Sequence, residues 1–158
     1  MAVHKLVLDN FFDEDPFSLI GIHCNLEDYR LAFLLNSNLN LRLKRKDKDL
    51  NFKNGASYSV FEWKNEKNQK TWNFVSNICK MNIVAASTQD SLFEDQVRTQ
   101  TFQLLPEFKK VNYLLKISSD IQLLNENRIV SNIQKIPQVI TAYSINNEQL
   151  ASKGNLIF

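Results

Sequence analysis

The pattern of apolar and polar residues in the first third of the chain predicts a strand, a helix and a second strand. Residues 17–25, FSLIGIHCN, are apolar and end in turn-forming residues, which is typical of a buried strand. Asn25 then stands where a helix N-cap is expected, with Glu27 and Asp28 in the first turn. The helix that follows has an apolar stripe made of Leu26, Tyr29, Ala32, Phe33 and Leu35.

From Leu39 to Lys46 the pattern changes to a period of two. Leucines alternate with asparagine, arginine and lysine, which predicts a strand with one face in water. Farther along, ASYSVFEWK and KTWNFVSNI flank the polar stretch NEKNQ, and this arrangement predicts a β-hairpin.

The last third of the chain repeats the order strand, helix, strand. Isoleucines recur at helical spacing in ENRIVSNIQKI, and Pro137 ends the predicted helix because proline lacks the amide N–H. The remaining predicted strands are 4–9, 99–105, 111–117 and 138–145.

These elements predict an α+β fold: a mixed, largely antiparallel sheet with two helices on one face, built from two strand-helix-strand units plus a β-hairpin. A ferredoxin-like arrangement with an inserted hairpin fits this order best. A chain of 158 residues is long enough for one core, so we expect a single domain over 1–158. Residues 80–98 have little pattern and predict a mobile loop, and 146–158 predict a C-terminal tail that ends in Leu-Ile-Phe.

Composition supports an ordinary globular domain. The chain is 44% hydrophobic and 23% charged with a net charge of +2, which excludes disorder as the main state and gives little electrostatic support for nucleic-acid binding. No window approaches the ~20 apolar residues that cross a bilayer, and the N-terminus lacks a secretory pattern. We therefore expect a cytoplasmic protein without membrane contact, in which Cys24 and Cys79 are buried thiols.

The usual signatures of catalysis and cofactor binding are missing from the sequence. His4 and His23 are the only histidines, and His23 and Cys24 are neighbours on a predicted strand, so their side chains point to opposite faces. There is neither a metal-ligand spacing nor a glycine-rich phosphate loop. The sequence thus predicts no catalytic residue, no metal and no cofactor.

A basic segment is the candidate nucleic-acid patch. Its cations could neutralise phosphates, and the aromatic residues of the hairpin could stack on bases. Alternatively, the segment is a wet edge strand protected by its lysines, and the aromatic residues belong to the core. Asp47 and Asp49 favour the second interpretation. The patch comprises Arg42, Lys44, Lys46 and Lys48, and the aromatic residues are Phe61, Trp63, Trp72 and Phe74.

The stretch LLPEFKKVNYLLKI places a charged bend between two apolar runs. It is either a strand connection with one aromatic anchor in the core, or a functional surface. A carboxylate beside a phenol could also perform acid–base chemistry. The candidate interaction surface comprises Pro106, Glu107, Lys109, Asn112 and Tyr113.

The nonapeptide LPEFKKVNY resembles the signature of the IPExxxVDY family. Pro106, Glu107, Val111 and Tyr113 match that signature, whereas Asn112 replaces its aspartate and removes a charge. Leucine at the first position replaces isoleucine. The similarity extends to SLIGIHCNLEDYRLAFLLN, RLKRKDKDL and KIPQVITAY. The resemblance implies a small cytoplasmic protein of Bacteroidetes-type bacteria, and it implies no established activity, cofactor or catalytic residue.

Three hypotheses about function remain open from the sequence. The first is a non-catalytic protein-interaction or regulatory module that binds an unknown protein partner or forms a homodimer. The second is an RNA- or ribosome-associated factor that uses the basic strand Arg42–Lys48. The third is an enzyme of unrecognised type centred on Glu107, Asn112 and Tyr113.

Overall fold

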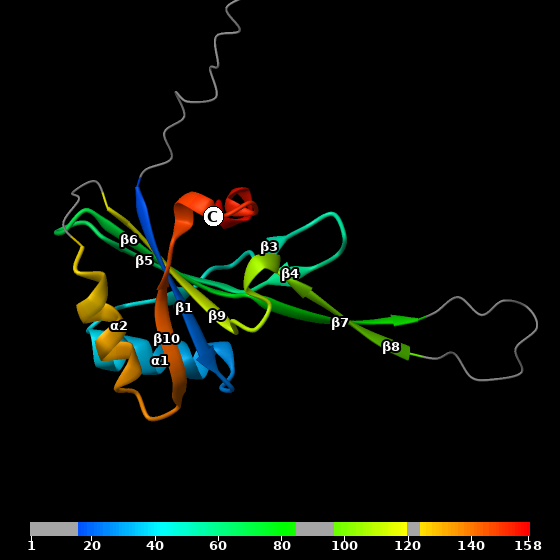
Figure 1. Ribbon diagram of the computed structural model, residues 1–158, viewed down its shortest axis with the longest axis horizontal. Coiled ribbons are helices and arrows are strands. Elements are labelled where there is room, and N and C mark those ends of the chain that lie inside the picture. Colours follow the sequence, from blue (N-terminus) through cyan, green and yellow to red (C-terminus); the bar gives the residue numbers. More distant parts are fainter. Residues whose placement is uncertain (1–15, 85–96, 120–123) are drawn as a thin grey trace, which may run out of the picture.

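The computed structural model describes residues 16–84, 97–119 and 124–158. Its centre is a six-stranded sheet with the order β10-β1-β9-β6-β5-β2, in which every neighbouring pair is antiparallel (Figure 1). The strands are β1 (Phe17–Cys24), β2 (Lys44–Arg45), β5 (Val60–Asn65), β6 (Lys70–Ser76), β9 (Tyr113–Ser119) and β10 (Val139–Ile145). The helices are α1 (Asp28–Leu39) and α2 (Glu126–Gln134).

Two small sheets and three short helical turns complete the described chain. The small sheets pair β3 (Leu50–Asn51) with β4 (Ser57–Tyr58) and β7 (Ile78–Val84) with β8 (Val97–Gln103). The β7–β8 hairpin projects from the body on the side away from the two helices (Figure 1). The 3-10 turns are η2 (Pro106–Phe108), η3 (Asn147–Gln149) and η4 (Lys153–Leu156).

This architecture confirms the predicted α+β fold. The β1-α1 and β9-α2-β10 segments interleave, so that β1 lies between β10 and β9, as in a split β-α-β arrangement. The predicted hairpin forms as β5 and β6, and it extends the sheet beyond β9. Both helices cover the same face, because side chains of α1 and α2 share one core with the sheet.

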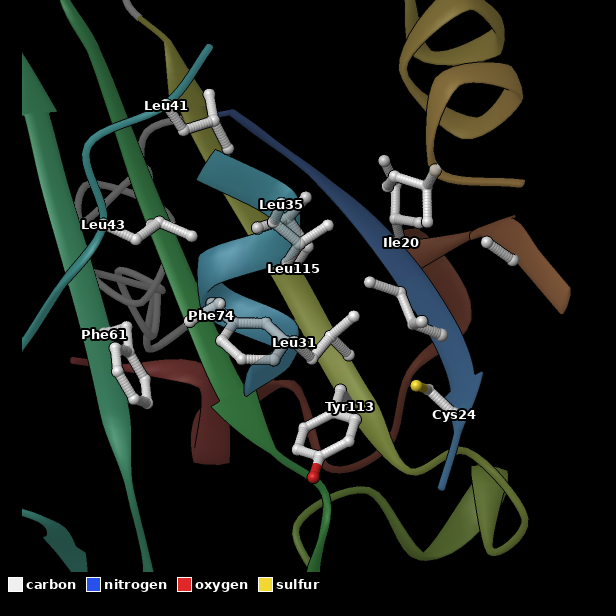
Figure 2. Close-up of a cluster of buried hydrophobic side chains, with 14 of the residues drawn as sticks. Ile20, Cys24, Leu31, Leu35, Leu41, Leu43, Phe61, Phe74, Tyr113 and Leu115 are labelled. Atoms are coloured by element: carbon white, nitrogen blue, oxygen red, sulfur yellow. The ribbon is translucent and has the colours of Figure 1, made fainter. Parts of the chain in front are cut away.

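The sheet carries an apolar core on each face. The helix-side core joins side chains from both helices to alternate residues of the strands, and Figure 2 shows it around Phe74. The opposite core joins the other faces of the strands to the chain around η2 and to the C-terminal tail. The opposite core includes Leu19, Tyr58, Leu104, Leu105, Leu114, Ile145 and Leu156.

The helix α1 differs from its prediction in its start and in the face that it buries. Its N-cap is Glu27 rather than Asn25, and no side chain caps it. Ala32 and Leu35 of the predicted stripe are buried in the core, as is Leu31. Tyr29 and Phe33 of the same stripe are 62% and 69% exposed. The helix is apolar on almost every side, so periodicity alone could not define which side faces the sheet.

The predicted strand over 39–46 is mostly wrong. The helix continues to Leu39, Asn40 adopts a left-handed conformation with φ 56°, and only Lys44–Arg45 pair as a strand. Asn36 donates from Nδ2 to the carbonyl of Leu43 at 3.1 Å and accepts from its N–H at 2.9 Å. These two bonds replace the ladder that a strand would form.

The predicted loop over 80–98 is shorter than expected. Residues 80–84 belong to β7 and residues 97–98 to β8, because the two strands pair in register from Ile78↔Gln103 to Val84↔Val97. Residues 85–96 lie outside the described residues, as does the predicted strand over 4–9. Neither of the two α-helices in the described segments is long and apolar enough to cross a membrane.

Candidate functional site

The motif at 105–113 is held by one buried asparagine, Asn77. Its Nδ2 donates to the carbonyls of Phe108 and Val111, each at 2.9 Å, and its Oδ1 accepts from the N–H of Leu105 at 2.8 Å. Asn77 is completely buried between β6 and β7. One side chain therefore satisfies three backbone groups of a connection that has no regular ladder to satisfy them.

Two residues of the motif bind the connection between β1 and α1. Asn112 accepts with Oδ1 from the N–H of Cys24 at 3.0 Å, and the Tyr113 hydroxyl donates to the carbonyl of Leu26 at 2.5 Å. The ring of Tyr113 lies in the helix-side core against Phe74 (Figure 2). Burial raises the pKa of the Tyr113 phenol to about 12, assisted by nearby acidic groups.

The remaining motif residues lie at the surface. The Glu107 carboxylate accepts hydrogen bonds from the backbone N–H of Ser152, at 3.2 Å, and from the Ser152 hydroxyl. Pro106 and Lys109 are exposed. The candidate interaction surface is thus divided: Asn112 and Tyr113 face the interior, whereas Glu107 joins η2 to the C-terminal tail. The predicted aromatic anchor is confirmed.

The C-terminal tail is packed onto the body. Leu156 is buried in the opposite core, and Phe158 packs against the same core with its ring 5.3 Å from the Lys116 ammonium. Lys116 also donates to the carbonyl of Leu156 at 2.7 Å. Ile157 alone among the last three residues points outward, with 64% of its surface exposed.

The basic segment is not one continuous cationic strand face. Arg42, Lys44 and Lys48 are exposed, whereas Lys46 forms an ion pair with Glu62 at 3.5 Å. Arg45 contacts Asp49 at 2.5 Å. Of the hairpin aromatic residues, only one is accessible enough to stack on a ligand. Phe61, Trp72 and Phe74 are buried in the helix-side core. Trp63 is half-buried at the margin of that core.

His23 and Cys24 contact different partners, on the two faces of the sheet. The His23 Nε2 atom lies 3.1 Å from the Tyr143 hydroxyl, with the two rings tilted against each other. The Cys24 thiol is buried in the helix-side core and donates to the carbonyl of Gln138 at 3.3 Å. The predicted opposite orientation of the two side chains is confirmed.

An apolar hollow of ≈ 540 Å³ lies along the outer side of α1. Tyr29 and Phe33 are one helical turn apart and line it together with Leu26, Leu34, Arg30 and Gln138. Leu26 and Leu34 also touch the helix-side core, so the hollow's floor is continuous with the packed interior. Sequence reasoning assigned Tyr29 and Phe33 to the core. The signal that could have revealed the hollow was a helix with more apolar residues than one buried face requires.

Comparison of the chain with protein-family models, with curated proteins and with solved structures gave no match.

Proposed function

We propose that this chain is a non-catalytic protein-interaction module whose docking surface is the outer face of α1. The observation that carries the proposal is the pair Tyr29 and Phe33, both more than three-fifths exposed over an apolar hollow. Two aromatic rings one turn apart leave a large apolar area in water, and a contiguous patch of this kind is a common mark of an interaction site.

The form of the hollow favours a protein segment over a small molecule. Small-molecule sites are usually concave and combine apolar walls with several convergent polar groups. Here the two aromatic residues are exposed, and apart from the Tyr29 hydroxyl only Arg30 and Gln138 supply polar side chains at the lining. An amphipathic helix laid along α1 would cover Tyr29 and Phe33 with residues at its own helical spacing.

Charge at the rim defines the partner further. Arg30 lines the hollow and lies 3.4 Å from Glu27, and both side chains are exposed. An acidic side chain on the partner could take the place of Glu27 as the ion-pair partner of Arg30. We therefore expect an amphipathic partner helix with an acidic residue beside its apolar stripe.

The motif at 105–113 has a supporting role in this proposal. Tyr113 binds the carbonyl of Leu26, which lines the hollow, and Asn112 binds the residue that ends β1. The motif that resembles the IPExxxVDY signature would then be a determinant of the fold that fixes the start of α1. Its role would be to orient the docking surface rather than to contact the partner.

The test is a pull-down of the tagged full chain from a native-cell lysate, treated with nuclease. The double variant Tyr29→Ser, Phe33→Ser is compared with Ile140→Ser, Ile157→Ser, which removes two other exposed apolar side chains. We expect one stoichiometric protein bound by the wild type and by the control and absent from the α1 variant. Retention by the α1 variant, or capture of no protein by the wild type, would contradict the proposal.

A further inference from the structure

A second, polar hollow lies where the sheet edge is incomplete. The strand β2 pairs only with Phe61 and Glu62 of β5, so no described strand lies beside Trp63–Asn65 on their outer side. The chain after α1 and the tip of the β5–β6 hairpin enclose a hollow of ≈ 450 Å³ at this place. A volume of this order is typical of small-ligand sites, which span roughly 300–1,000 Å³.

The fold presents Arg42 to this hollow. Leu41 and Leu43 on either side of it point into the helix-side core (Figure 2), and the two hydrogen bonds from Asn36 fix Leu43. Arg42, between two buried neighbours, is exposed and lines the hollow. Its backbone position is therefore defined by packing rather than left to a free loop.

The lining has a positive balance. Arg42, Lys64 and Lys67 line the hollow, against a single carboxylate, that of Glu66. Lys64 lies 3.8 Å from Glu62, but no ion pair involves Arg42 or Lys67 within the described ranges. By contrast, Arg45 on β2 forms an ion pair with Asp49, and Lys46, the next residue, forms one with Glu62. Lys44 and Lys48 are exposed as well but do not line the hollow, so they provide a matched comparison for the cations that do.

An aromatic ring completes the lining. Trp63 packs with one part against the helix-side core and contributes another part to the hollow. Asn40 and Asn65 add amide groups that can donate or accept hydrogen bonds. A cationic rim beside an accessible indole is the combination that binds a phosphate and a stacked base at once.

We propose that this hollow binds a nucleotide, with its phosphate at Arg42 and Lys67 and its base against Trp63. The two charged side chains supply electrostatic attraction, and the guanidinium can bind two phosphate oxygens in one plane. The indole offers a stacking face to any base. This site differs from the nucleic-acid patch predicted over 42–48, because Lys46 does not line it and the tip of the β5–β6 hairpin supplies most of its lining.

The test uses two probes, adenosine monophosphate and a fluorescein-labelled single-stranded RNA octamer. In a Trp72→Phe chain, Trp63 is the only tryptophan, and we expect both probes to quench its fluorescence. Anisotropy of the labelled octamer with the wild-type chain gives the affinity without relying on a variant of the buried Trp72. Quenching by the octamer alone would show that the bound nucleotide must belong to a nucleic-acid strand. Quenching by both probes would show that a mononucleotide is sufficient for binding.

The matched variants separate the hollow from general electrostatics. Arg42→Gln, Lys67→Gln should weaken octamer binding at least about tenfold. The slope of the logarithm of affinity against the logarithm of salt concentration should become shallower by about one for each phosphate that the variant no longer binds. Lys44→Gln, Lys48→Gln removes the same charge outside the hollow and should change the affinity less than about twofold. Equal weakening by both pairs, or no quenching of Trp63 by either probe, would overturn the proposal.

Discussion

At the scale of single residues, two asparagine side chains hold the connection between β8 and β9, and Asn77 among them is completely buried. Asn77 binds the backbone of 105–111 at three points, and Asn112 binds the end of β1. A backbone group left without a partner in the interior costs about 1–3 kcal/mol, so each of these hydrogen bonds stabilises the fold by preventing such a penalty. The motif at 105–113 is therefore a structural element built from polar residues.

A substitution at Asn112 distinguishes the acceptor oxygen from the rest of the amide. Asn112→Ala leaves the N–H of Cys24 without its partner and should lower the free energy of unfolding by about 1–3 kcal/mol. Asn112→Asp keeps an acceptor oxygen and should cost less than about 1 kcal/mol. Urea unfolding of the two variants measures both values. Equal decreases would show that the acceptor oxygen is not what matters.

The raised pKa of Tyr113 predicts that the folded state is less stable at high pH. The pKa of this phenol is raised from 10.0 to about 12, first by burial and then by Asp28, and that of Tyr58 is raised to about 12 as well. The folded state thus favours the neutral phenols. The free energy of unfolding should be constant with respect to these groups below pH 10 and fall as the pH rises from 10 toward 12.

Denaturant midpoints measured across this pH range check the prediction. Tyr113→Phe should have a shallower decline than the wild type, because one of the phenols with a raised pKa is gone, while those of Tyr58 and Tyr143 remain. The variant should also be less stable at neutral pH, since the carbonyl of Leu26 no longer has its donor. Identical slopes for variant and wild type would refute the assignment to Tyr113.

At the scale of secondary-structure elements, β1 lies in the interior of the sheet with a partner strand on each side. It pairs along its length with β10 on one side and with β9 on the other, and its two faces enter different cores. Gly21 lies on the face of the opposite core. A Cβ atom there would lie 3.0 Å from Cδ1 of Ile145 and 3.4 Å from a methyl of Val111.

Gly21→Ala should therefore destabilise the protein by overpacking, by about 1–3 kcal/mol. Gly154→Ala is the matched control, because nothing lies within 4 Å of a Cβ atom at that position. We expect thermal unfolding to show a lower midpoint for the first variant and little change for the second. A Gly21→Ala protein as stable as the control would show that β10 and the 105–113 motif yield readily around β1.

Elements with strong local patterns could be predicted from the sequence. The alternation in the hairpin, the apolar run of β1 and the capped, proline-terminated α2 all carry local signals, and Asn125 caps α2 as it accepts from the N–H of Arg128 at 3.1 Å. The buried face of α1 could not be predicted, because apolar residues surround this helix. The pairing of β7 with β8 joins residues that are separated in sequence, so no local pattern predicts it. The conformation of residues 39–46 depends on the two hydrogen bonds between Asn36 and Leu43.

The candidate sites were harder to predict for a related physical reason. Surface exposure depends on tertiary packing. In the folded chain Tyr29 and Phe33 are exposed, whereas Phe61 and Trp72 are buried in the core. The sequence singled out Arg42, but its neighbourhood with Lys67 arises only when the hairpin tip folds beside the end of α1.

At the scale of the whole molecule, the C-terminal tail is part of the second core. Leu156 is buried against the face of the sheet opposite the helices, while Ile157 points into solvent. Leu156→Ala should lower the free energy of unfolding by about 2–5 kcal/mol, because it removes buried methyl groups and leaves a cavity. Ile157→Ala, next to it, should change stability by less than about 0.5 kcal/mol. Chemical unfolding followed by circular dichroism measures both, and similar values for the two variants would contradict the packed tail.

The two cores leave two large aromatic side chains on the outer face of α1 exposed. One side of this helix packs on the sheet, and the other presents Tyr29 and Phe33 to solvent. The 105–113 motif binds the end of β1 and the chain that leads into α1, so the docking surface that we propose begins at a segment held by two side-chain hydrogen bonds. Site-specific photo-crosslinking in native cells tests this arrangement most directly.

The chain would carry benzoylphenylalanine at Phe33 or, as a control, at Ile140, which is 66% exposed on β10. The proposal predicts one discrete crosslinked protein from position 33, identified by mass spectrometry, and none of it from position 140. An adduct with twice the mass of the chain would show that a second copy of the chain binds at α1. It would contradict the proposal that the partner is a different protein. No discrete adduct at position 33, or the same adducts from both positions, would contradict the proposed docking surface.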